Sequence, residues 1–400
     1  MSLRVLVAPS GFKESIGPRE AAHAIAAGVR KALPDADIDT LPMIDGGEAF
    51  AVTLVELTNG TLHAVRASGP NGRTVDAHVG FLGGSGARTA VIDVASVVGL
   101  RLVPRAKRNM LTATSFGVGE LIAKSLELGA ERILIGCGDS GVNDGGAGIA
   151  MALGAGLFDI DGESLERGAK SLEHLHWIDV SGLDARVRHV QIDAAVNWHN
   201  TLLGPGGVSH VYGPQKGANP EQIEVLERGL ERYTAALLDV SGIDVAAMPG
   251  AGASGGIGAT LAGLLGATLR PRFEVISTYL DFDRFLRKAD LVITAEGRID
   301  GQSARGKVPA EIGNRARVLG IPVIVLAGAI GEGAERVHEQ GVTAFACIAS
   351  GPTTLAEAIS SNEEQLAAAA EQMVRLVAAS RGVGLAGRKV AKGRSRRMVG

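Results

Sequence analysis

The chain has 400 residues, 46% hydrophobic and 21% charged, which is the balance of an ordinary folded protein and favours two domains. A net charge of -3 and an aromatic content of 4% argue against a surface that binds nucleic acid, and no run approaches the roughly 20 apolar residues of a membrane span. Cys137 and Cys347 form no CxxC pair, which argues against structural zinc or a disulfide framework and favours a reducing, cytoplasmic location.

The first elements predict a βαβ unit. Arg4–Ala8 is an apolar run typical of a buried parallel strand. Pro18–Leu33 has apolar residues at helical spacing and a proline in its first turn, and Asp37–Pro42 reads as a second strand. Strand, helix and strand in succession indicate a parallel sheet.

The pattern changes in the middle of the chain. Val65–Leu82 alternates around the turn sequence Gly69–Gly72, which predicts a pair of antiparallel strands and the start of a second domain. Beyond it we expect strands at Ala90–Val94, Arg132–Ile135 and Val190–Ala195. We expect helices at Ser115–Leu128 and Gln222–Val240. Pro249–Gly258 is a glycine-rich turn that opens another helix.

From Ala289 onward the first pattern returns, with three buried strands that end in small residues and helices between them. We therefore predict an α/β protein of two domains. Residues 1–66 and 285–385 form a parallel three-layer α/β domain from both chain ends, and residues 67–284 form an inserted mixed α/β domain. Residues 386–400 are rich in Lys and Arg and predict a disordered tail.

Glycines beside carboxylates or lysines recur in the predicted loops. In α/β proteins ligands bind at the carboxyl ends of the strands. A glycine lets backbone N–H groups approach an oxyanion, and an adjacent acid can hold a cation, although any one such turn can be purely structural. The loops are Pro9–Ser15, Asp45–Glu48, Gly138–Gly146, Asn197–Gly204, Pro214–Gly217 and Glu296–Lys307.

Two familiar motifs are disfavoured. Gly250–Gly255 matches GxGxxG, but the βαβ unit and the acid of a dinucleotide site are not evident, which disfavours a nicotinamide cofactor. Gly301–Lys307 matches the start of a Walker A loop, yet Val308 stands where that loop needs Ser or Thr. An anion site at the N-terminus of the following helix stays open.

Taken in chain order, these loops resemble the motifs of the bacterial type I glycerate kinases, from about Arg4 to about Ala379. The matching segments are Phe12-Lys13, Asp45–Glu48 (DGGE), Ser115–Leu121 (SFGVGEL), Asn143–Gly148 (NDGGAG), Gly213–Ala218 (GPQKGA), Pro249–Gly252 (PGAG) and Glu296–Ser303 (EGRIDGQS). The resemblance implies ATP-dependent phosphorylation of glycerate with magnesium, in a cleft between two α/β domains. The expected reaction converts D-glycerate to 2-phosphoglycerate.

The resemblance also implies the residues of the site. The catalytic candidates are Asp45, Asp144, Lys13 and Asn197, with Asp45 the first choice to orient the hydroxyl. The substrate-binding candidates are Arg298, Glu48, Ser303 and Asp300. The candidates that contact ATP are Gly145, Gly146, Asn143, Lys307 and Gly252, and those that hold Mg²⁺ are Asp144 and Glu296. The expected partners are a small hydroxy acid and ATP, with no nucleic acid or membrane, and a homo-oligomer stays open.

Three departures from the family pattern fall in these loops. Ser10 stands in place of an aspartate, Asp139 adds an acid, and Asn197 replaces an aspartate. An asparagine cannot act as a general base, although it can orient a hydroxyl. The departures leave three interpretations open: a glycerate kinase with neutral changes, a kinase of a longer sugar acid, or a catalytically impaired ligand-binding paralogue.

Overall fold

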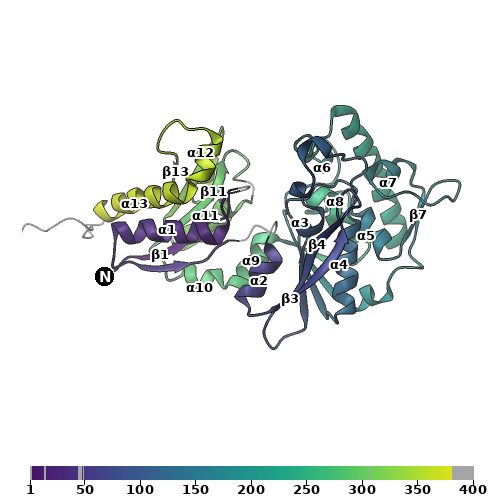
Figure 1. Ribbon diagram of the computed structural model, residues 1–400, viewed down its shortest axis with the longest axis horizontal. Helices are drawn as coiled ribbons and strands as arrows, with labels where there is room; N and C mark the ends of the chain where they lie inside the picture. The colour runs from purple at the N-terminus through teal and green to yellow at the C-terminus, as the bar shows by residue number, and fades with distance from the viewer. Residues whose placement is uncertain (1, 13–14, 44–46, 48, 305, 381–400) are drawn as a thin grey trace, which may run out of the picture. The chain divides into compact units, whose positions relative to one another are not determined.

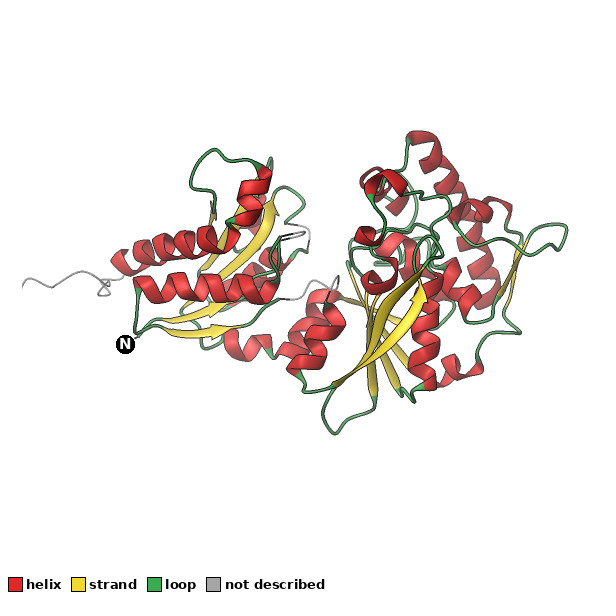
Figure 2. Cartoon of the chain, in the orientation of Figure 1, coloured by secondary structure: helices red, strands yellow, loops and turns green. Residues whose placement is uncertain are grey.

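The computed structural model describes residues 2–12, 15–43, 47, 49–304 and 306–380 (Figure 1). The chain divides into two compact units. Unit 1 comprises Met1–Met43 and Phe282–Gly400, and unit 2 comprises Ile44–Asp281. Each unit combines helices with its own sheet (Figure 2).

Unit 1 contains a five-stranded parallel sheet with the order β13-β12-β11-β1-β2. The strands are β1 (Arg4–Val7), β2 (Asp37–Thr40), β11 (Leu291–Ile299), β12 (Val323–Ile330) and β13 (Ala344–Cys347). The helices are α1 (Pro18–Ala32), α10 (Phe282–Leu286), α11 (Val308–Val318), α12 (Leu355–Ser360) and α13 (Asn362–Ser380), with the 3-10 helix η5 (Ala334–Gln340). The predicted βαβ rhythm at both chain ends thus forms one sheet.

Helices cover both faces of this sheet, as the predicted three layers require. Ile293 and Leu326 belong to a core shared with α1 and α13, which lie side by side. Val325 and Ala327 point to the opposite face, into a smaller core that includes η5 residues, and α11 contacts β11, β12 and η5. The alternation follows from the two-residue period of a strand.

The strand order places a topological switch point between β1 and β11. From β1 the chain continues through α1 to β2 on one side, and from β11 it continues through α11 to β12 on the other. In open α/β sheets, ligands commonly bind at the carboxyl ends of the strands at such a switch point. The expected position of a ligand site in unit 1 is at these strand ends.

Unit 2 contains a six-stranded mixed sheet with the order β10-β9-β6-β5-β4-β3. Its parallel strands are β5 (Thr89–Asp93), β6 (Arg132–Gly136), β9 (Gln191–Val196) and β10 (Thr268–Pro271). The antiparallel strands β3 (Thr61–Ser68) and β4 (Thr74–Phe81) continue the sheet beyond β5. A separate two-stranded ribbon consists of β7 (Gly156–Phe158) and β8 (Trp177–Asp179).

Helices of unit 2 lie against this sheet, and most of them share one large core with it. They are α2 (Phe50–Leu57), α3 (Val94–Val98), α4 (Phe116–Glu127), α5 (Ala147–Ala152), α6 (Val208–Lys216), α7 (Pro220–Ser241), α8 (Ala253–Gly263) and α9 (Arg272–Leu280). The short 3-10 helices are η1 (Leu100–Leu102), η2 (Arg105–Lys107), η3 (Ala169–His174) and η4 (Ala185–His189). Ile92 and Ile133 of the sheet pack in one core with Leu121 of α4 and Leu230 of α7.

The division between the units lies earlier than the predicted boundary at 66/67. That boundary falls inside β3, which pairs with β4 along its whole length from Thr61 to Ser68. Helix α2 also contacts β3, β4 and β5, so it belongs with the sheet of unit 2. The second predicted boundary, at 284/285, falls inside α10, and unit 1 resumes at Phe282. The predicted tail, residues 386–400, lies outside the described residues.

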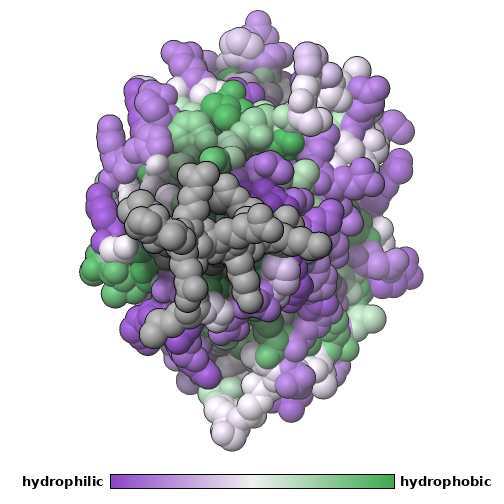
Figure 3. Space-filling model, turned by 90° about the vertical axis from the view of Figure 1, so that its left-hand side faces the viewer, coloured by the Kyte–Doolittle hydropathy of each residue, from purple (hydrophilic) through white to green (hydrophobic). Residues whose placement is uncertain are grey.

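Hydrophilic side chains cover much of the face shown in Figure 3, and hydrophobic ones gather in small patches between them. Scattered exposed apolar side chains are normal for a folded protein. None of the helices in the described part of the chain has both the length and the hydropathy needed to cross a membrane.

Candidate functional site

In unit 1, charged residues cluster where β11 extends beyond the end of its neighbour β1. The pairing of β1 with β11 ends at Ile293, whereas β11 continues to Ile299 beside β12. Glu296 and Arg298 lie on this extension. The turn after it carries Asp300, Ser303 and Lys307, and the structure thus brings together all five predicted site residues of this segment.

Two ion pairs organise the cluster. The Nζ atom of Lys307 lies 2.9 Å from Oε1 of Glu296, and both side chains are largely buried. The Nε atom of Arg298 lies 3.3 Å from Oδ2 of Asp300, and 65% of the Arg298 side chain is exposed. Because exposed ion pairs contribute little free energy, Arg298 can exchange Asp300 for an incoming carboxylate at small cost.

Ser303 holds the turn together. Its Oγ atom accepts hydrogen bonds from the backbone N–H of Asp300 at 3.2 Å and from Nζ of Lys307 at 3.4 Å, and donates to the carbonyl of Arg298 at 3.4 Å. The residue is fully buried. The predicted substrate-binding role is therefore not favoured for its hydroxyl, which instead positions the two flanking charges.

The loop after β1 packs under this cluster. The Ser10 hydroxyl donates to the carbonyl of Ala295 at 2.8 Å, which ties the loop to β11. Phe12 is buried, and carbon atoms added at Gly297 and Gly328 would touch it. Ser10, the first departure from the family pattern, thus has a structural role here. Lys13, the next candidate, lies outside the described residues.

In unit 2, two glycine-rich loops and the loop that follows β9 meet at the carboxyl ends of β6 and β9. Gly145 and Gly255 are both at positive φ, 66° and 76°, and the N–H of Gly145 donates to the carbonyl of Gly255 at 3.0 Å. A Cβ atom at Gly255 would overlap the carbonyl oxygen of Val142. Glycine is required at this contact for both its backbone conformation and its lack of a side chain.

The third loop, Asn197–Gly204, contacts the second. The N–H of Gly252 donates to the carbonyl of Asn200 at 3.2 Å, and a Cβ atom at Gly252 would overlap the carbonyl of Thr201. Asn197 follows β9 directly and is half-buried, and its Oδ1 atom accepts from the N–H of His199 at 3.3 Å. The amide of Asn197 is thereby oriented at the strand end, where a ligand can reach it.

Asp144 is fully buried beneath these loops. Its Oδ2 atom accepts from the N–H of Ser115 at 2.7 Å, the hydroxyl of Ser115 at 2.9 Å and the N–H of Gly148 at 3.2 Å, and Oδ1 accepts from the N–H of Gly146 at 3.2 Å. Burial raises the pKa of this carboxyl, and the hydrogen bonds oppose that shift.

These contacts give Asp144 a structural role, whereas its predicted catalytic and metal-binding roles stay predictions. A carboxylate with no exposed surface and with both oxygens already hydrogen-bonded is a poor ligand for a solvent-borne Mg²⁺ and a poor proton acceptor for a substrate hydroxyl. The carboxylate instead joins the start of α4, where Ser115 is the N-cap residue, to the start of α5. It fixes the loop that lies between the two helices and the sheet.

Helix α6 also holds the 138–146 loop in place through hydrogen bonds. The Nδ2 atom of buried Asn143 donates to the hydroxyl of Ser209 at 3.1 Å. The Nζ atom of buried Lys216 donates to the carbonyl of Val142 at 2.7 Å and to the hydroxyl of Ser140 at 3.2 Å. Ser209 and Lys216 are seven residues apart, a spacing that places both on one helix face.

Sequence reasoning missed the role of Lys216. Pro214–Gly217 was predicted to be a loop, but α6 includes Pro214 and ends at Lys216, and Gly217 caps it at φ 100°. Burial lowers the pKa of Lys216 to about 7, and the charge of Asp144 opposes that shift. The seven-residue spacing from Ser209 was the available signal, but it needs the helix to be recognised first.

Two further buried residues support the loop. The hydroxyl groups of Tyr233 and Thr260 lie 2.6 Å apart, and Thr260 donates to the carbonyl of Gly145 at 2.8 Å. Neither residue was predicted. Asp45 and Glu48 were predicted to belong to the site, but they lie outside the described residues. Within the described part of the chain, no group of three or more His, Cys, Asp or Glu side chains could hold a metal ion by itself.

Comparison with known proteins adds direct evidence. The pattern of the Glycerate kinase family matches residues 5–378. The glycerate kinase of Bacillus subtilis (strain 168) is 40% identical over 378 residues, covering 94% of this chain and 97% of that protein. The glycerate 2-kinase of Escherichia coli (strain K12) is 41% identical over 89% of this chain and 93% of its own length.

A solved structure has the same fold. The crystal structure described as glycerate kinase 2 from Salmonella typhimurium LT2 is similar with a TM-score of 0.78 at 40% sequence identity. The similarity covers 96% of this chain and 100% of that one.

Proposed function

The chain belongs to the glycerate kinase family, and from this premise we propose that it transfers a phosphoryl group from ATP to D-glycerate, giving 2-phosphoglycerate. Membership makes it a kinase that acts on a hydroxyl group. The observation that carries the proposal is the match of the family pattern across residues 5–378. The name of the Escherichia coli relative, glycerate 2-kinase, supports the choice of product.

The charged cluster of unit 1 supports binding of the anionic substrates. Arg298 is largely exposed and offers the planar fork that suits a carboxylate such as that of glycerate. Lys307 stands at the N-terminus of α11, where unpaired N–H groups and the helix dipole also favour an anion. We propose that Arg298 and Asp300 bind the hydroxy acid. Lys307 then binds a phosphate group, either the one being transferred or another one of the nucleotide.

The glycine loops of unit 2 support binding of the nucleotide. Phosphoryl transfer depends mainly on positioning and on donors around the phosphates. Gly145, Gly146 and Gly252 are themselves buried in the contacts between loops, as is Asn143. We therefore propose that they shape the surface that holds ATP through close backbone packing. Asn197, at the end of β9, orients the acceptor hydroxyl.

Glu296 fits a role toward Mg²⁺ and Asp144 does not. Magnesium is often held by one or two carboxylates together with substrate phosphates and water, so a single side chain suffices from this unit. Glu296 lies on the extension of β11 and is paired with Lys307, so a carboxylate oxygen of Glu296 can exchange the lysine for the metal ion. The ion would neutralise charge that develops on the phosphates. A cytoplasmic location and the oligomeric state stay predictions.

The proposal is tested by measuring ATP consumption by the purified protein with Mg²⁺, on D-glycerate and on a panel of longer hydroxy acids. We expect the highest kcat/KM on D-glycerate. Consumption of ATP on none of the acids would contradict the proposal and favour a ligand-binding protein without turnover.

Turnover confined to a longer sugar acid would support the second candidate function. The observation that favours it is Asn197, a partly exposed amide where the family resemblance predicts an aspartate. The variant Asn197→Asp separates the two. A gain in kcat on D-glycerate would indicate a glycerate kinase weakened at this position, and a loss would indicate a site retuned for another acid.

A further inference from the structure

The turn that follows β9 carries Asn197, which the proposed function assigns to the acceptor hydroxyl. The carbonyl of Asn197 accepts from the N–H of Asn200 at 3.2 Å, and its Oδ1 atom accepts from the N–H of His199 at 3.3 Å. With that oxygen engaged, the amide N–H₂ is the group of Asn197 that can donate to a ligand. The direction of this donor depends on how the turn from Asn197 to Asn200 is held.

A tyrosine of α6 holds this turn. The hydroxyl of Tyr212 donates to the Oδ1 atom of Asn200 at 2.8 Å, and both side chains are half-buried. The carbonyl of Asn200 accepts from the N–H of Gly252 at 3.2 Å. Asn200 therefore joins the turn to a helix through its side chain and to a glycine-rich loop through its backbone.

Helix α6 is a firm support for this contact, because the same helix is tied to the 138–146 loop. Ser209 accepts a hydrogen bond from that loop, and Lys216 donates two hydrogen bonds to it. Ser209, Tyr212 and Lys216 are separated by three and four residues, a spacing that places side chains on one face of a helix. This face thus joins a loop assigned to the nucleotide to the turn assigned to the acceptor.

We propose that Tyr212 and Asn200 are positioning residues for phosphoryl transfer: their side-chain hydrogen bond fixes the direction in which Asn197 presents its amide to the acceptor hydroxyl. This rests on the proposed function, in which Asn197 orients that hydroxyl. A displacement of about 1 Å at a reacting group can lower a rate by up to about 100-fold. Loss of one hydroxyl that acts through Asn200 can therefore change kcat.

Steady-state kinetics of Tyr212→Phe tests this role, because the substitution removes the hydroxyl and keeps the ring. We expect kcat on D-glycerate to fall about tenfold, while KM for ATP and for D-glycerate changes by less than about threefold. Tyr279→Phe is the matched control, because it removes the hydroxyl of a half-buried tyrosine of α9. Its kcat should stay within about twofold of that of the unmodified protein. An equally small change in Tyr212→Phe would overturn the proposal.

A double-mutant cycle shows whether the two side chains act as one unit. Asn200→Ala removes the acceptor of the same hydrogen bond, so it should also lower kcat about tenfold. Combined with Tyr212→Phe, it should lower kcat by less than about twofold more, because the contact is already absent. Additive losses would contradict the proposal, since Tyr212 would then act independently of Asn200.

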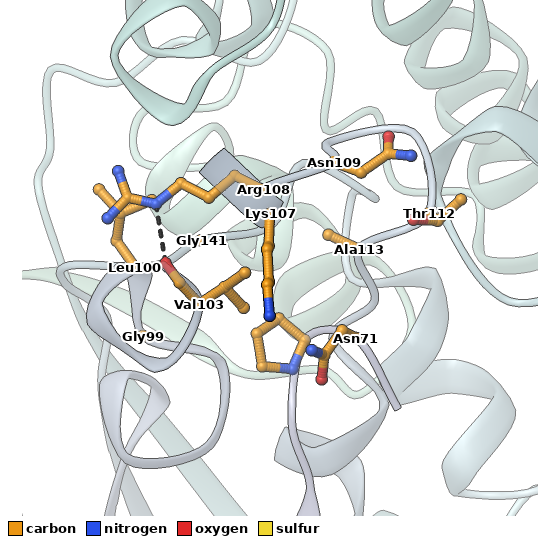
Figure 4. Close-up of a pocket in the computed structure, with 11 residues that line it drawn as sticks. Asn71, Gly99, Leu100, Val103, Lys107, Arg108, Asn109, Thr112, Ala113 and Gly141 are labelled. Atoms are coloured by element: carbon orange, nitrogen blue, oxygen red, sulfur yellow. Dashed lines mark hydrogen bonds between the residues drawn. The ribbon is translucent and has the colours of Figure 1, made fainter. Parts of the chain in front are cut away.

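Hydrogen exchange of the intact protein, read by mass spectrometry, follows the turn without any turnover. We expect residues 197–204 to exchange about fivefold faster or more in Tyr212→Phe, because the turn opens more often. Residues 138–146 should change by less than about twofold, because this loop has other anchors. The N–H of Gly141 donates to the carbonyl of Val98 at 2.7 Å, and Gly141 lies next to Leu100 (Figure 4).

The exchange rates also separate this proposal from the proposed function. Equal increases over 197–204 and 138–146 would indicate a general loss of stability and would refute a local role, as would unchanged exchange over 197–204. If the unmodified protein consumes ATP with none of the acids, the proposed function fails. Faster exchange confined to 197–204 would then still support Tyr212 as the residue that holds the turn.

Discussion

At the scale of single residues, the buried polar groups under the glycine loops decide how rigid the candidate site is. Lys216 and Asp144 both hold the 138–146 loop, the first through Val142 and Ser140 and the second through the starts of two helices. Removing one partner from a buried hydrogen bond leaves the other unsatisfied, which costs about 1–3 kcal/mol. Substitutions here should therefore affect folding and catalysis together.

Lys216 predicts a pH dependence of stability. Its pKa is lowered to about 7 by burial, whereas an unfolded lysine titrates near about 10.4. Between these values the unfolded chain binds a proton that the folded chain lacks, so the contribution of this group to stability rises with pH. Below about pH 7, Lys216 is protonated in both the folded and the unfolded chain, and its buried charge destabilises the folded state fully.

We therefore expect the free energy of unfolding of Lys216→Met to rise less steeply with pH than that of the unmodified protein. The difference in slope should reach at most about 1.4 kcal/mol per pH unit between pH ~7 and ~9. Urea unfolding at several pH values measures it. Lys170→Met, at an exposed position, should keep the original slope. Equal slopes for all three proteins would show that Lys216 is not buried as described.

Glycine at position 255 predicts a large effect of a single methyl group. Gly255→Ala must place a Cβ against the carbonyl of Val142 at a positive φ, so we expect a loss of about 3 kcal/mol or more, with reduced kcat. Gly266→Ala is the matched control, because Gly266 also has positive φ, 66°, but nothing lies within 4 Å of an added Cβ. Its cost should be about 1–2 kcal/mol, which is the conformational part alone. Equal losses, measured by urea unfolding, would contradict the packing of the loops.

At the scale of elements, much of the fold was predictable because it depends on local patterns. The apolar runs before the glycine loops became β1, β6, β9, β11 and β12, and the alternating segment became the hairpin of β3 and β4. Ser115 is the N-cap residue of α4, but its hydroxyl bonds to Asp144 instead of capping its own helix. A tertiary partner of this kind leaves no periodic signal in the sequence.

The features that sequence reasoning missed also depend on tertiary contacts, which leave no periodic signal in the sequence. Helix α6 contains Pro214 and follows a turn, so its apolar spacing was too weak to recognise, and the burial of Lys216 went with it. Asp144 was predicted to be catalytic from the family resemblance, and its burial was not foreseen. Whether such a group faces solvent or a helix N-terminus is decided by packing between segments that are distant in sequence, here the segment of Ser115, 29 residues from Asp144.

The shared carboxylate of Asp144 makes a prediction about α4 and α5. Asp144→Asn places an amide N–H₂ against backbone N–H donors and removes the negative charge near two helix N-termini, so stability should fall by about 2–4 kcal/mol. Chemical unfolding measures the loss, and circular dichroism reports whether helix content falls. Asp161→Asn, in an exposed turn, should change stability by less than about 0.5 kcal/mol. If both substitutions had small effects, the carboxylate of Asp144 would not join the helices.

At the scale of the whole molecule, the chain forms two units with separate sheets, and the sequence of unit 1 is interrupted by that of unit 2. Unit 2 contains all six strands of its sheet and its own large core, whereas β1 and β2 of unit 1 need β11 and β12 from the far end of the chain. Insertion of one such unit into another is tolerated when each buries its own core.

The fragment 44–281 should therefore fold alone. We expect a cooperative urea transition and a far-ultraviolet spectrum with both helix and strand content, because the large core that extends from Ala67 to Leu269 consists of residues of unit 2. The fragment 1–43 should show no cooperative transition, since its two strands lack their partner β11. A gradual, non-cooperative melt of fragment 44–281 would contradict the division into units.

The most direct test of the proposed activity is a phosphorus NMR spectrum, recorded without proton decoupling, of the protein with ATP, Mg²⁺ and D-glycerate. A phosphate ester on the secondary hydroxyl couples to one carbon-bound proton and gives a doublet, whereas an ester on the primary hydroxyl couples to two and gives a triplet. We predict a new doublet that grows in step with ADP. A triplet would contradict the assignment of 2-phosphoglycerate as the product, and the absence of any new ester signal would contradict the assignment of this chain as an ATP-dependent glycerate kinase.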